Sequence, residues 1–409
     1  STAWLGVMPQ AVATALFSPT NGLGLSILRV RIDPEGSPSG GGASGDPYET
    51  GEWDQELTNA QEAVAANAKA IVFASPWTAP ASMKSTSTAQ PYSSCTEGTG
   101  YCGGYLNPAD YAAYATYLED FVSFFNANAG FNLYAISMQN EPDQNATYES
   151  CLWTPQQMDT WVASNASTIT SDPYHTKFMM PESNSFVPAQ AATALSDTNA
   201  EGQISIVAGH IYQVLFGGSI TAYPPFPAGD TPKELWMTEF GPLSTATPTW
   251  TEALTTYAPT IHNSMVVGQY NAYVWWGIFG APTNAGSYGF VDNSGNLTVF
   301  GDVMGQYSKW VLPGYTHVGV TDSAGESANV LISAYTGTES GTQHYVIVAI
   351  NTSGSPVSQS FTLQNGTVTS MTPYQSTSAA GLVPQSAIAV TGDAFTYTLP
   401  AQSITTFVQ

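Results

Sequence analysis

Two glutamates close predicted strands and offer the residue pair that hydrolysis of a sugar–sugar bond requires. Glu141 ends the apolar run Leu133–Glu141, and Glu239 ends the run Glu234–Glu239. In retaining glycoside hydrolysis one carboxylate attacks the sugar carbon, while the other protonates the leaving oxygen and later deprotonates water. The chain holds only 7 Lys and Arg against 30 Asp and Glu, so structural ion pairing is a poor explanation for both glutamates.

The elements that position these glutamates alternate between apolar strands and helices, which predicts the α/β class. The strands lack strict alternation of polar and apolar residues, as expected when both faces of a parallel sheet are buried. Seven strand-then-helix units predict a closed (β/α)8 or TIM barrel, with the remaining strand at or before Ser1. The seven runs are Ser26–Asp33, Ala70–Pro76, Leu133–Glu141, Lys177–Glu182, Ile204–Tyr212, Glu234–Glu239 and Ala272–Phe279.

Barrel active sites lie at the carboxyl ends of the strands. When the missing first strand is counted, Glu141 and Glu239 end the fourth and seventh strands, which lie nearly opposite each other across the barrel mouth. The two carboxyl groups are therefore expected within the roughly 5–5.5 Å that a retaining mechanism needs.

Capping residues predict where two helices begin and end. Asn107-Pro108 is expected to open one helix, with Asn as the cap and Pro at the first helical position. Gly130 is expected to end it. Thr154-Pro155 opens another helix in the same way.

The sequence changes character after Pro313-Gly314, where the helical period disappears. Short alternating runs follow, such as Asn329–Tyr335 and His344–Ile350, separated by Ser, Thr and Gly. We therefore predict a catalytic barrel over residues 1–310 and a C-terminal side β-sandwich over residues 311–409.

Composition excludes several functions. With a net charge of −23 and seven cations, the chain cannot build the basic patch that nucleic acid needs, and an acidic membrane would repel it. No metal-ligand spacing occurs among its 5 His and 3 Cys, so neither a metal nor another cofactor is expected. The low charged fraction of 9% suits an exported protein. We also expect the protein to be a monomer.

Three cysteines and several Asn-x-Ser/Thr sequences also bear on export. Cys95 and Cys102 can close a small disulfide ring that leaves Cys151 as a buried thiol, although Cys151 can compete for either partner. The sequence leaves this pairing open. The glycosylation acceptors, weak support for secretion as a glycoprotein, are Asn145, Asn165, Asn296, Asn351 and Asn365.

Several motifs together resemble glycoside hydrolase family 30, and most closely its xylanase and glucuronoxylanase branch. The resemblance covers nearly the whole chain and implies a secreted retaining enzyme acting on plant cell-wall xylan, with Glu141 as acid/base and Glu239 as nucleophile. The motifs are Asn140-Glu141-Pro142-Asp143, Trp236-Met237-Thr238-Glu239, Ser75-Pro76-Trp77-Thr78-Ala79-Pro80, Val207-Ala208-Gly209-His210-Ile211-Tyr212 and Asn271-Ala272-Tyr273-Val274-Trp275-Trp276.

Position suggests supporting roles for polar neighbours of the two glutamates. Asn140 is suited to bond the sugar 2-hydroxyl, with a turn-capping Asn as the alternative. Tyr212 can bond the Glu239 carboxylate, or simply be a core tyrosine. His210 either lines the floor of the site or satisfies a backbone carbonyl, and we favour the second interpretation.

Aromatic residues near strand ends are candidates for sugar contacts, because sugar faces stack on rings. Trp276 is the candidate platform under the sugar at the cleavage point. Trp77 and Trp4 are candidate walls, although a single Trp is more often part of a core. The chain contains 10 Trp.

One departure from the glucuronoxylan-specific branch concerns substrate recognition. In that branch an arginine follows the last strand and binds the glucuronate side group. Here the corresponding segment is Trp276-Gly277-Ile278-Phe279-Gly280-Ala281-Pro282. No Arg or Lys follows it before Lys309. We therefore predict an endo-β-1,4-xylanase that does not depend on glucuronate. The alternatives are a β-1,6-galactanase or β-1,6-glucanase on the same scaffold, and a non-catalytic carbohydrate-binding protein.

Overall fold

The computed structural model describes residues 1–37, 53–85, 101–227, 230–243, 246–280, 288–321, 328–364 and 368–409. The chain forms two compact units. The first comprises Ser1–Gln10, Ile27–Pro242 and Gly268–Gly277, and the second comprises Ala11–Ser26, Leu243–Val267 and Ile278–Gln409. This division interleaves the two units along the chain and differs from a single boundary after residue 310, which stays a prediction.

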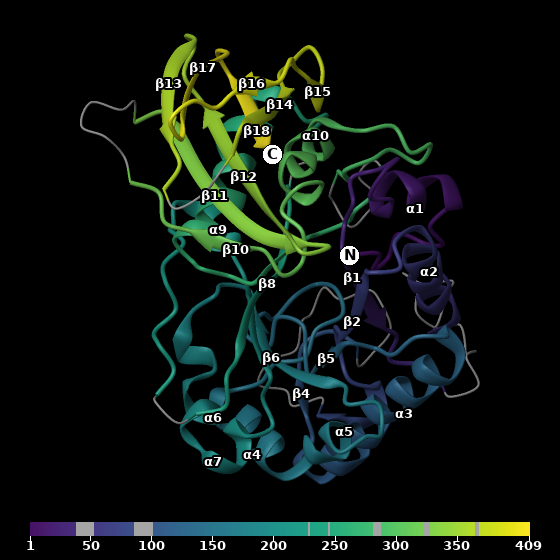
Figure 1. Cartoon of the computed structure of the whole chain (residues 1–409). Coiled ribbons are helices and arrows are strands. Elements are labelled where there is room, and N and C mark those ends of the chain that lie inside the picture. Colours follow the sequence, from purple (N-terminus) through teal and green to yellow (C-terminus); the bar gives the residue numbers. More distant parts are fainter. Residues whose placement is uncertain are drawn as a thin grey trace. The chain divides into compact units, whose positions relative to one another are not determined.

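Seven parallel strands form the centre of the first unit, and its helices lie around them (Figure 1). Each strand falls within, or within one residue of, one of the seven predicted apolar runs, so the predicted strand order and count are confirmed. In sheet order the strands are β1 (Ile27–Ile32), β2 (Ile71–Pro76), β5 (Ala135–Ser137), β6 (Lys177–Ser183), β7 (Ile206–His210), β8 (Glu234–Phe240) and β9 (Ala272–Trp275).

The first two residues of the chain lie between the two edge strands of this sheet. The amino group of Ser1 donates to the Trp275 carbonyl of β9 at 2.7 Å, and the Thr2 amide donates to the Arg29 carbonyl of β1 at 3.1 Å. These contacts nearly close the barrel, at the place where the eighth strand was expected. The apolar interior below the mouth comprises Phe73, Ala135, Met179, Ile206, Ala208, Trp236, Ala272 and Val274.

The helix-capping predictions are largely confirmed. Thr154 caps α4 (Pro155–Asn165) in a reciprocal capping box with Gln157. Gly130 ends α3 (Tyr111–Ala129) with a left-handed φ of 84°. Asn107 does precede a helical turn, η2 (Pro108–Asp110), but its side chain makes no capping hydrogen bond, so its predicted capping role is wrong.

The remaining elements of the first unit are short, apart from one helix that follows β1. No helix in the described ranges combines the length and apolar character needed to cross a bilayer. These elements are α2 (Trp53–Ala66), η1 (Ala81–Met83), β3 (Lys84–Ser85), β4 (Tyr105–Leu106), α5 (Ser167–Thr170), η3 (Pro188–Gln190), α6 (Ala192–Ser196), α7 (Thr198–Glu201) and η4 (Tyr212–Phe216).

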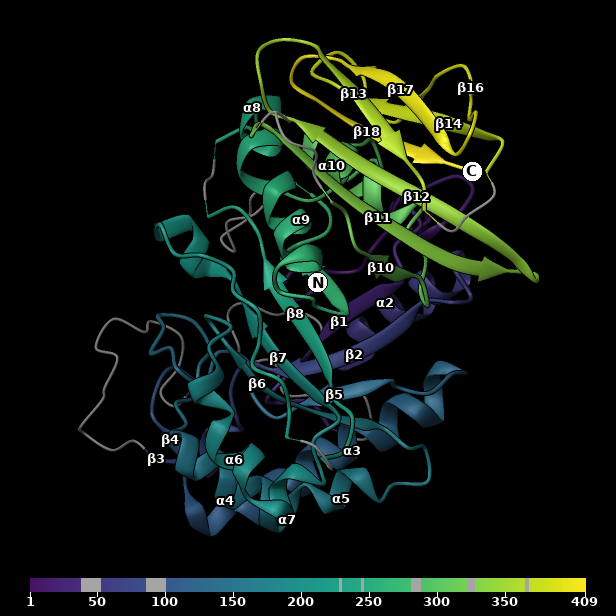
Figure 2. The ribbon, with the colours of Figure 1, turned by 60° about the vertical axis from the view of Figure 1, so that its left-hand side comes forward.

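The second unit contains an antiparallel β-sandwich, best followed in Figure 2 along the long pair β11 and β12. One sheet runs β10-β11-β12-β18-β14-β15, with β16 paired to β14, and a second sheet pairs β13 with β17. Side chains from both sheets share one core that includes Ile347, Phe361, Phe395 and Phe407, which confirms the predicted sandwich.

The bounds of the second unit's elements place every strand after Pro313-Gly314, as predicted. The strands are β10 (Thr316–Val318), β11 (Val330–Glu339), β12 (Thr342–Asn351), β13 (Val357–Thr362), β14 (Ser370–Ser376), β15 (Val383–Pro384), β16 (Ile388–Ala389), β17 (Ala394–Leu399) and β18 (Ser403–Val408). The helices are α1 (Gln10–Phe17), α8 (Trp250–Glu252), η5 (Ala253–Tyr257), α9 (Ala258–Val266) and α10 (Val299–Ser308).

One predicted glycosylation acceptor is buried in this sandwich. Asn351 has no exposed surface, and its amide donates to the Pro400 carbonyl at 2.8 Å and the Ser355 carbonyl at 3.0 Å. A glycan cannot be attached to an amide enclosed in this way, so the prediction is wrong at Asn351. The acceptor at Asn365 lies outside the described residues.

Candidate active site

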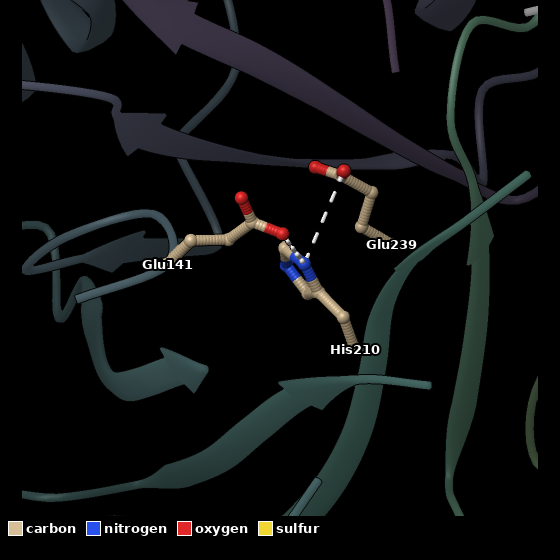
Figure 3. A group of neighbouring side chains, drawn as sticks. All are labelled: Glu141, His210 and Glu239. Carbon is tan, nitrogen blue, oxygen red and sulfur yellow. Dashed lines mark hydrogen bonds and ion pairs between the residues drawn. The ribbon is translucent and has the colours of Figure 1, made fainter. Parts of the chain in front are cut away.

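Three strand ends bring Glu141, His210 and Glu239 together in the first unit (Figure 3). His210 is the last residue of β7, Glu239 lies one residue before the end of β8, and Glu141 follows β5 by four residues. One atom from each side chain lies within 4.8 Å of the other two. The two carboxylates thus converge at the strand ends, as the strand pattern predicted. Their catalytic roles, and the separation of about 5–5.5 Å that double displacement needs, stay predictions.

The Glu141 carboxylate receives three hydrogen-bonding groups. Asn184 Nδ2 donates to Oε1 at 2.6 Å, His210 Nδ1 lies 3.2 Å from the same oxygen, and the Tyr148 hydroxyl donates to Oε2 at 2.7 Å. Burial raises the pKa of Glu141, but the hydrogen bond and charge of His210, with the two other donors, outweigh burial and hold this pKa below its usual value.

The backbone at Glu141 is held in an uncommon conformation. Its φ is 44°, in the left-handed region that non-glycine residues seldom occupy. The Glu141 amide donates to the Glu182 carbonyl at 2.9 Å, and Glu182 itself has a φ of 55°. Such residues cluster at functional sites, where the surrounding structure holds them in place.

The Glu239 carboxylate has a different environment. Arg29 of β1 forms an ion pair through Nη1 with Oε2, and the Tyr212 hydroxyl donates to Oε1 at 3.0 Å. Both partners hold the carboxylate in a fixed orientation. The hydrogen bond predicted between Tyr212 and Glu239 is confirmed.

Arg29 connects Glu239 to the opposite side of the site. This fully buried guanidinium donates to Asn140 Oδ1 at 2.6 Å and lies 3.2 Å from Glu182 Oε1. Its carbon lies 4.4 Å above the Trp77 ring. One cation thus orients both Glu239 and the residue before Glu141.

We predict that Arg29→Met lowers the free energy of unfolding by about 3–5 kcal/mol, because it leaves the buried carboxylates of Glu182 and Glu239 without their cation. Urea unfolding followed by circular dichroism measures the change. Lys69→Met is the matched control, since Lys69 is exposed and its replacement is expected to change stability by less than about 0.5 kcal/mol. Equal stability of the two variants would contradict the prediction.

His210 differs from its sequence-based interpretation. Its Nδ1 faces the carboxylates of Glu141 and, at 3.9 Å, Glu239, rather than a backbone carbonyl. Its Nε2 has no hydrogen-bond partner among the described residues. Burial by itself lowers the pKa of His210, but the charge of Glu239 and the hydrogen bond to Glu141 outweigh it, so this pKa is raised. His210 and Glu141 thus lie within hydrogen-bonding distance, so the protonation of one affects that of the other.

The predicted tryptophans form one aromatic cluster. Trp4 lies 5.2 Å from Trp77 and 5.5 Å from Trp276 between ring centroids. Trp77 is only 1% exposed and lies beneath Arg29, so the expectation that it forms a cleft wall is not met. Trp4 keeps partial exposure and Trp276 keeps 7%, so both remain candidates for sugar contacts.

A metal ion has one geometrically possible place among the described residues, the same group of Glu141, His210 and Glu239. The Arg29 guanidinium on Glu239 already supplies a positive charge there, and a divalent cation beside it would be repelled. The donor set therefore fits proton transfer and nucleophilic attack better than metal binding. The expected lack of a metal or other cofactor stays a prediction.

Residues that sequence reasoning missed complete the site. Glu182 ends a predicted strand as the two glutamates do, and that position was a usable signal. Asn184 and Tyr148 lie on connecting segments, where no pattern marks them. Their roles become visible only through the contacts with Glu141.

The cysteines lie partly outside the described residues. Cys102 is disulfide-bonded, and Cys151 is a free, buried thiol as expected in one of the two alternatives. Cys95 lies outside the described residues, and so does most of the loop that carries it.

A parallel barrel with two facing glutamates at its strand ends has the architecture of a glycoside hydrolase. A model of the glycosyl hydrolase family 30 TIM-barrel domain matches residues 49–219. Glucuronoxylanase XynC of Bacillus subtilis (strain 168) is 36% identical over 410 residues, spanning 99% of this chain and 86% of the relative. The chain belongs to glycosyl hydrolase family 30, in its xylanase and glucuronoxylanase branch.

Two solved structures share this fold along nearly the whole chain. The family 30 subfamily 8 xylanase Xyn30A from Clostridium acetobutylicum matches with a TM-score of 0.82 and 36% identity, covering 99% of this chain and 94% of that one. A family 30 endoxylanase from Clostridium papyrosolvens C71 matches with a TM-score of 0.79 at the same identity and coverage.

Proposed function

We propose that this chain is a retaining endo-β-1,4-xylanase that does not require glucuronate side groups. The observation that carries the proposal is the approach of the Glu141 and Glu239 carboxylates within 4.8 Å, each with a different set of partners. The xylanase and glucuronoxylanase names of relatives at 36% identity support xylan as the substrate.

In the first half of the reaction, a Glu239 oxygen attacks the anomeric carbon of xylose. The bond from that carbon to the glycosidic oxygen breaks, and the oxygen takes a proton from Glu141. Arg29 and Tyr212 orient the Glu239 carboxylate toward that carbon, while His210 supplies the proton that Glu141 needs. The product is a covalent glycosyl-enzyme and a shortened xylan chain.

In the second half, Glu141 acts as a base. It takes a proton from a water molecule, whose oxygen attacks the same carbon from the opposite face and releases Glu239. Two inversions at one carbon give net retention. Asn140, whose Oδ1 is occupied by Arg29, has its amide NH2 left to donate to the sugar 2-hydroxyl. Trp4 and Trp276 are proposed to contact the sugar faces.

Independence from glucuronate is supported by the positions of all seven cations of the chain. Arg29 and Arg31 are buried and paired, Arg31 with Asp33 at 2.9 Å and with Glu149. Lys84 is buried and donates to Thr78 Oγ1 and to backbone carbonyls. Arg29 and Arg31 are thus ion-paired within the protein, and Lys84 donates its hydrogen bonds to protein oxygens.

The other four cations lie away from the strand ends that carry the glutamates, or in the second unit. Lys69, Lys177 and Lys233 lie at the amino ends of β2, β6 and β8, the opposite edge of the barrel. Lys309 belongs to the second unit, where it donates to the Gly22 carbonyl. No cation is thus available at the mouth of the first unit to pair with a uronate carboxylate.

We predict that kcat/KM differs by less than about threefold between glucuronoxylan oligosaccharides and the same oligosaccharides without glucuronate. If the site depended on a charged contact with glucuronate, kcat/KM would fall by about ten- to a hundredfold on substrates without that group. Steady-state rates measure kcat/KM on both substrates, and mass spectrometry of the products shows which bonds are cleaved. Cleavage confined to bonds at a fixed position from each glucuronate would refute glucuronate independence, and hydrolysis of β-1,6-galactan or β-1,6-glucan alone would refute the xylan substrate.

Export of the protein is also proposed. The disulfide at Cys102 and the low density of charge support it, because disulfides persist mainly in oxidising compartments. Fractionation of the producing cells, with immunodetection in the medium, tests this proposal. Retention of all protein inside the cells would reject it.

A further inference from the structure

Tyr148 contacts the Glu141 carboxylate but has no part in the steps above. It lies on the segment between β5 and α4, and its hydroxyl donates to Glu141 Oε2 at 2.7 Å. Asn184 and His210 contact the other oxygen, Oε1. Tyr148 is therefore the sole hydrogen-bond donor on Oε2 among the described residues.

Neighbouring contacts hold this phenol in place. Glu149, the next residue, is 1% exposed and forms a two-point ion pair with Arg31 of β1, with Nε donating to Oε2 at 2.9 Å. Ser150 Oγ accepts from the Gly103 amide at 2.9 Å. The Tyr148 ring packs edge-on against Trp4, 6.0 Å between centroids. A bidentate buried ion pair is a geometrically specific anchor, so the hydroxyl has a defined position.

We propose that Tyr148, anchored through Glu149 and Arg31, is a positioning residue that aims Glu141 and favours its ionised form. The proposal rests on the proposed function, in which Glu141 must be ionised when it deprotonates water. Tyr148 acts through Glu141 and is not assigned a contact with the reacting sugar atoms.

The charges around Tyr148 keep it a donor. Burial raises the pKa of its phenol, and the adjacent Glu141 charge and hydrogen bond raise it further. The phenol thus stays protonated throughout the working pH range and stabilises the carboxylate. The titratable or charged groups that face Glu141 are Arg29 of β1, His210 of β7, Glu239 of β8, Tyr212, and Asp143 and Tyr148 of its own segment.

The direct test is the titration of Glu141 in protein labelled with carbon-13 at the glutamate δ position. The Glu141 signal is identified by its loss in Glu141→Gln. In Tyr148→Phe we expect the Glu141 midpoint at higher pH than in the wild type, because the ionised form has lost a donor. Tyr111→Phe is the control, since this nearby tyrosine stacks on Trp153 and does not bond Glu141. Equal midpoints in Tyr148→Phe and the wild type would overturn the proposal.

The pH profile of kcat/KM on xylo-oligosaccharides is the second readout. Glu141 must be protonated for the first step, so Tyr148→Phe should move the basic limb to higher pH. At the wild-type optimum, the loss of a fixed contact should lower kcat/KM by about two- to tenfold. A profile lowered uniformly without displacement would indicate a merely structural role and reject the proposal.

Failure of the proposed function and failure of the inference about Tyr148 would give different results. If the wild type hydrolyses no xylan, the proposed function fails, while the carbon-13 titration still decides the role of Tyr148. If the wild type is active and Glu141→Gln is not, but Tyr148→Phe titrates like the wild type, only the inference about Tyr148 fails.

Discussion

Glu239→Gln is expected to lower kcat on xylan by about 10⁴-fold or more, since removal of a hydrolase nucleophile costs factors of this size. Glutamine keeps the shape of the side chain but cannot form the glycosyl-enzyme. Reducing-sugar release measures the loss, and binding of xylohexaose by calorimetry should persist. Glu234→Gln is the matched control, because Glu234 lies at the opposite end of the same strand and pairs with Lys177.

A chemical rescue separates loss of the nucleophile from loss of folding. In Glu239→Ala, azide has room to attack the anomeric carbon of an aryl β-xyloside directly. The aryloxide leaves, and one inversion gives the α-xylosyl azide. Proton NMR of the product distinguishes the anomers. Wild-type activity in Glu239→Gln, or formation of the β-azide in Glu239→Ala, would end the assignment of Glu239 as nucleophile.

The loss caused by Glu141→Gln is expected to depend on the leaving group. Xylan has a poor leaving group and needs a proton, so its hydrolysis should fall by about 10²–10⁴-fold. A dinitrophenyl β-xylobioside needs none, so its first step should stay near the wild-type rate. The glycosyl-enzyme then accumulates, because no base activates water, and a burst of dinitrophenol precedes slow turnover.

Stopped-flow absorbance measures this burst, and azide added to Glu141→Ala should restore turnover and yield the β-xylobiosyl azide. Glu119→Gln is the control, since Glu119 lies on α3 and, within the described part of the chain, bonds Ser123 alone. An equal loss on xylan and on the dinitrophenyl substrate would exclude Glu141 as the acid/base. With azide, the alanine variants of the two glutamates should therefore give products of opposite anomeric configuration, α for Glu239→Ala and β for Glu141→Ala.

The strand pattern was enough to place the glutamates. Parallel strands in one barrel present their carboxyl ends at the same edge, so any residue that closes a predicted strand is brought to the mouth. Glu141 and Glu239 meet that condition, and Tyr212 follows from it as well. Glu182 ends the predicted strand Lys177–Glu182, so the same reasoning also places Glu182 at the mouth.

Sequence patterns did not reveal which partners these side chains choose. Arg29 reaches Glu239 across 210 positions of the chain, and His210 turns to Glu141 rather than to a carbonyl. These choices depend on rotamers and burial inside the barrel, which alternation and spacing do not encode. Trp77 is an example, because its position beside a strand end suggested a wall, yet packing placed it under a guanidinium.

The sequence by itself determined the barrel, the later β-sandwich and the two strand-end glutamates, because period and capping are local properties of the chain. Only the tertiary structure decided which partners hold each carboxylate, how the pKa of Glu141 is shifted, and that Ala11–Ser26 and Leu243–Val267 join the second unit. The physical reason is that a pKa and a contact both depend on groups far apart in sequence, brought within a few ångströms by folding.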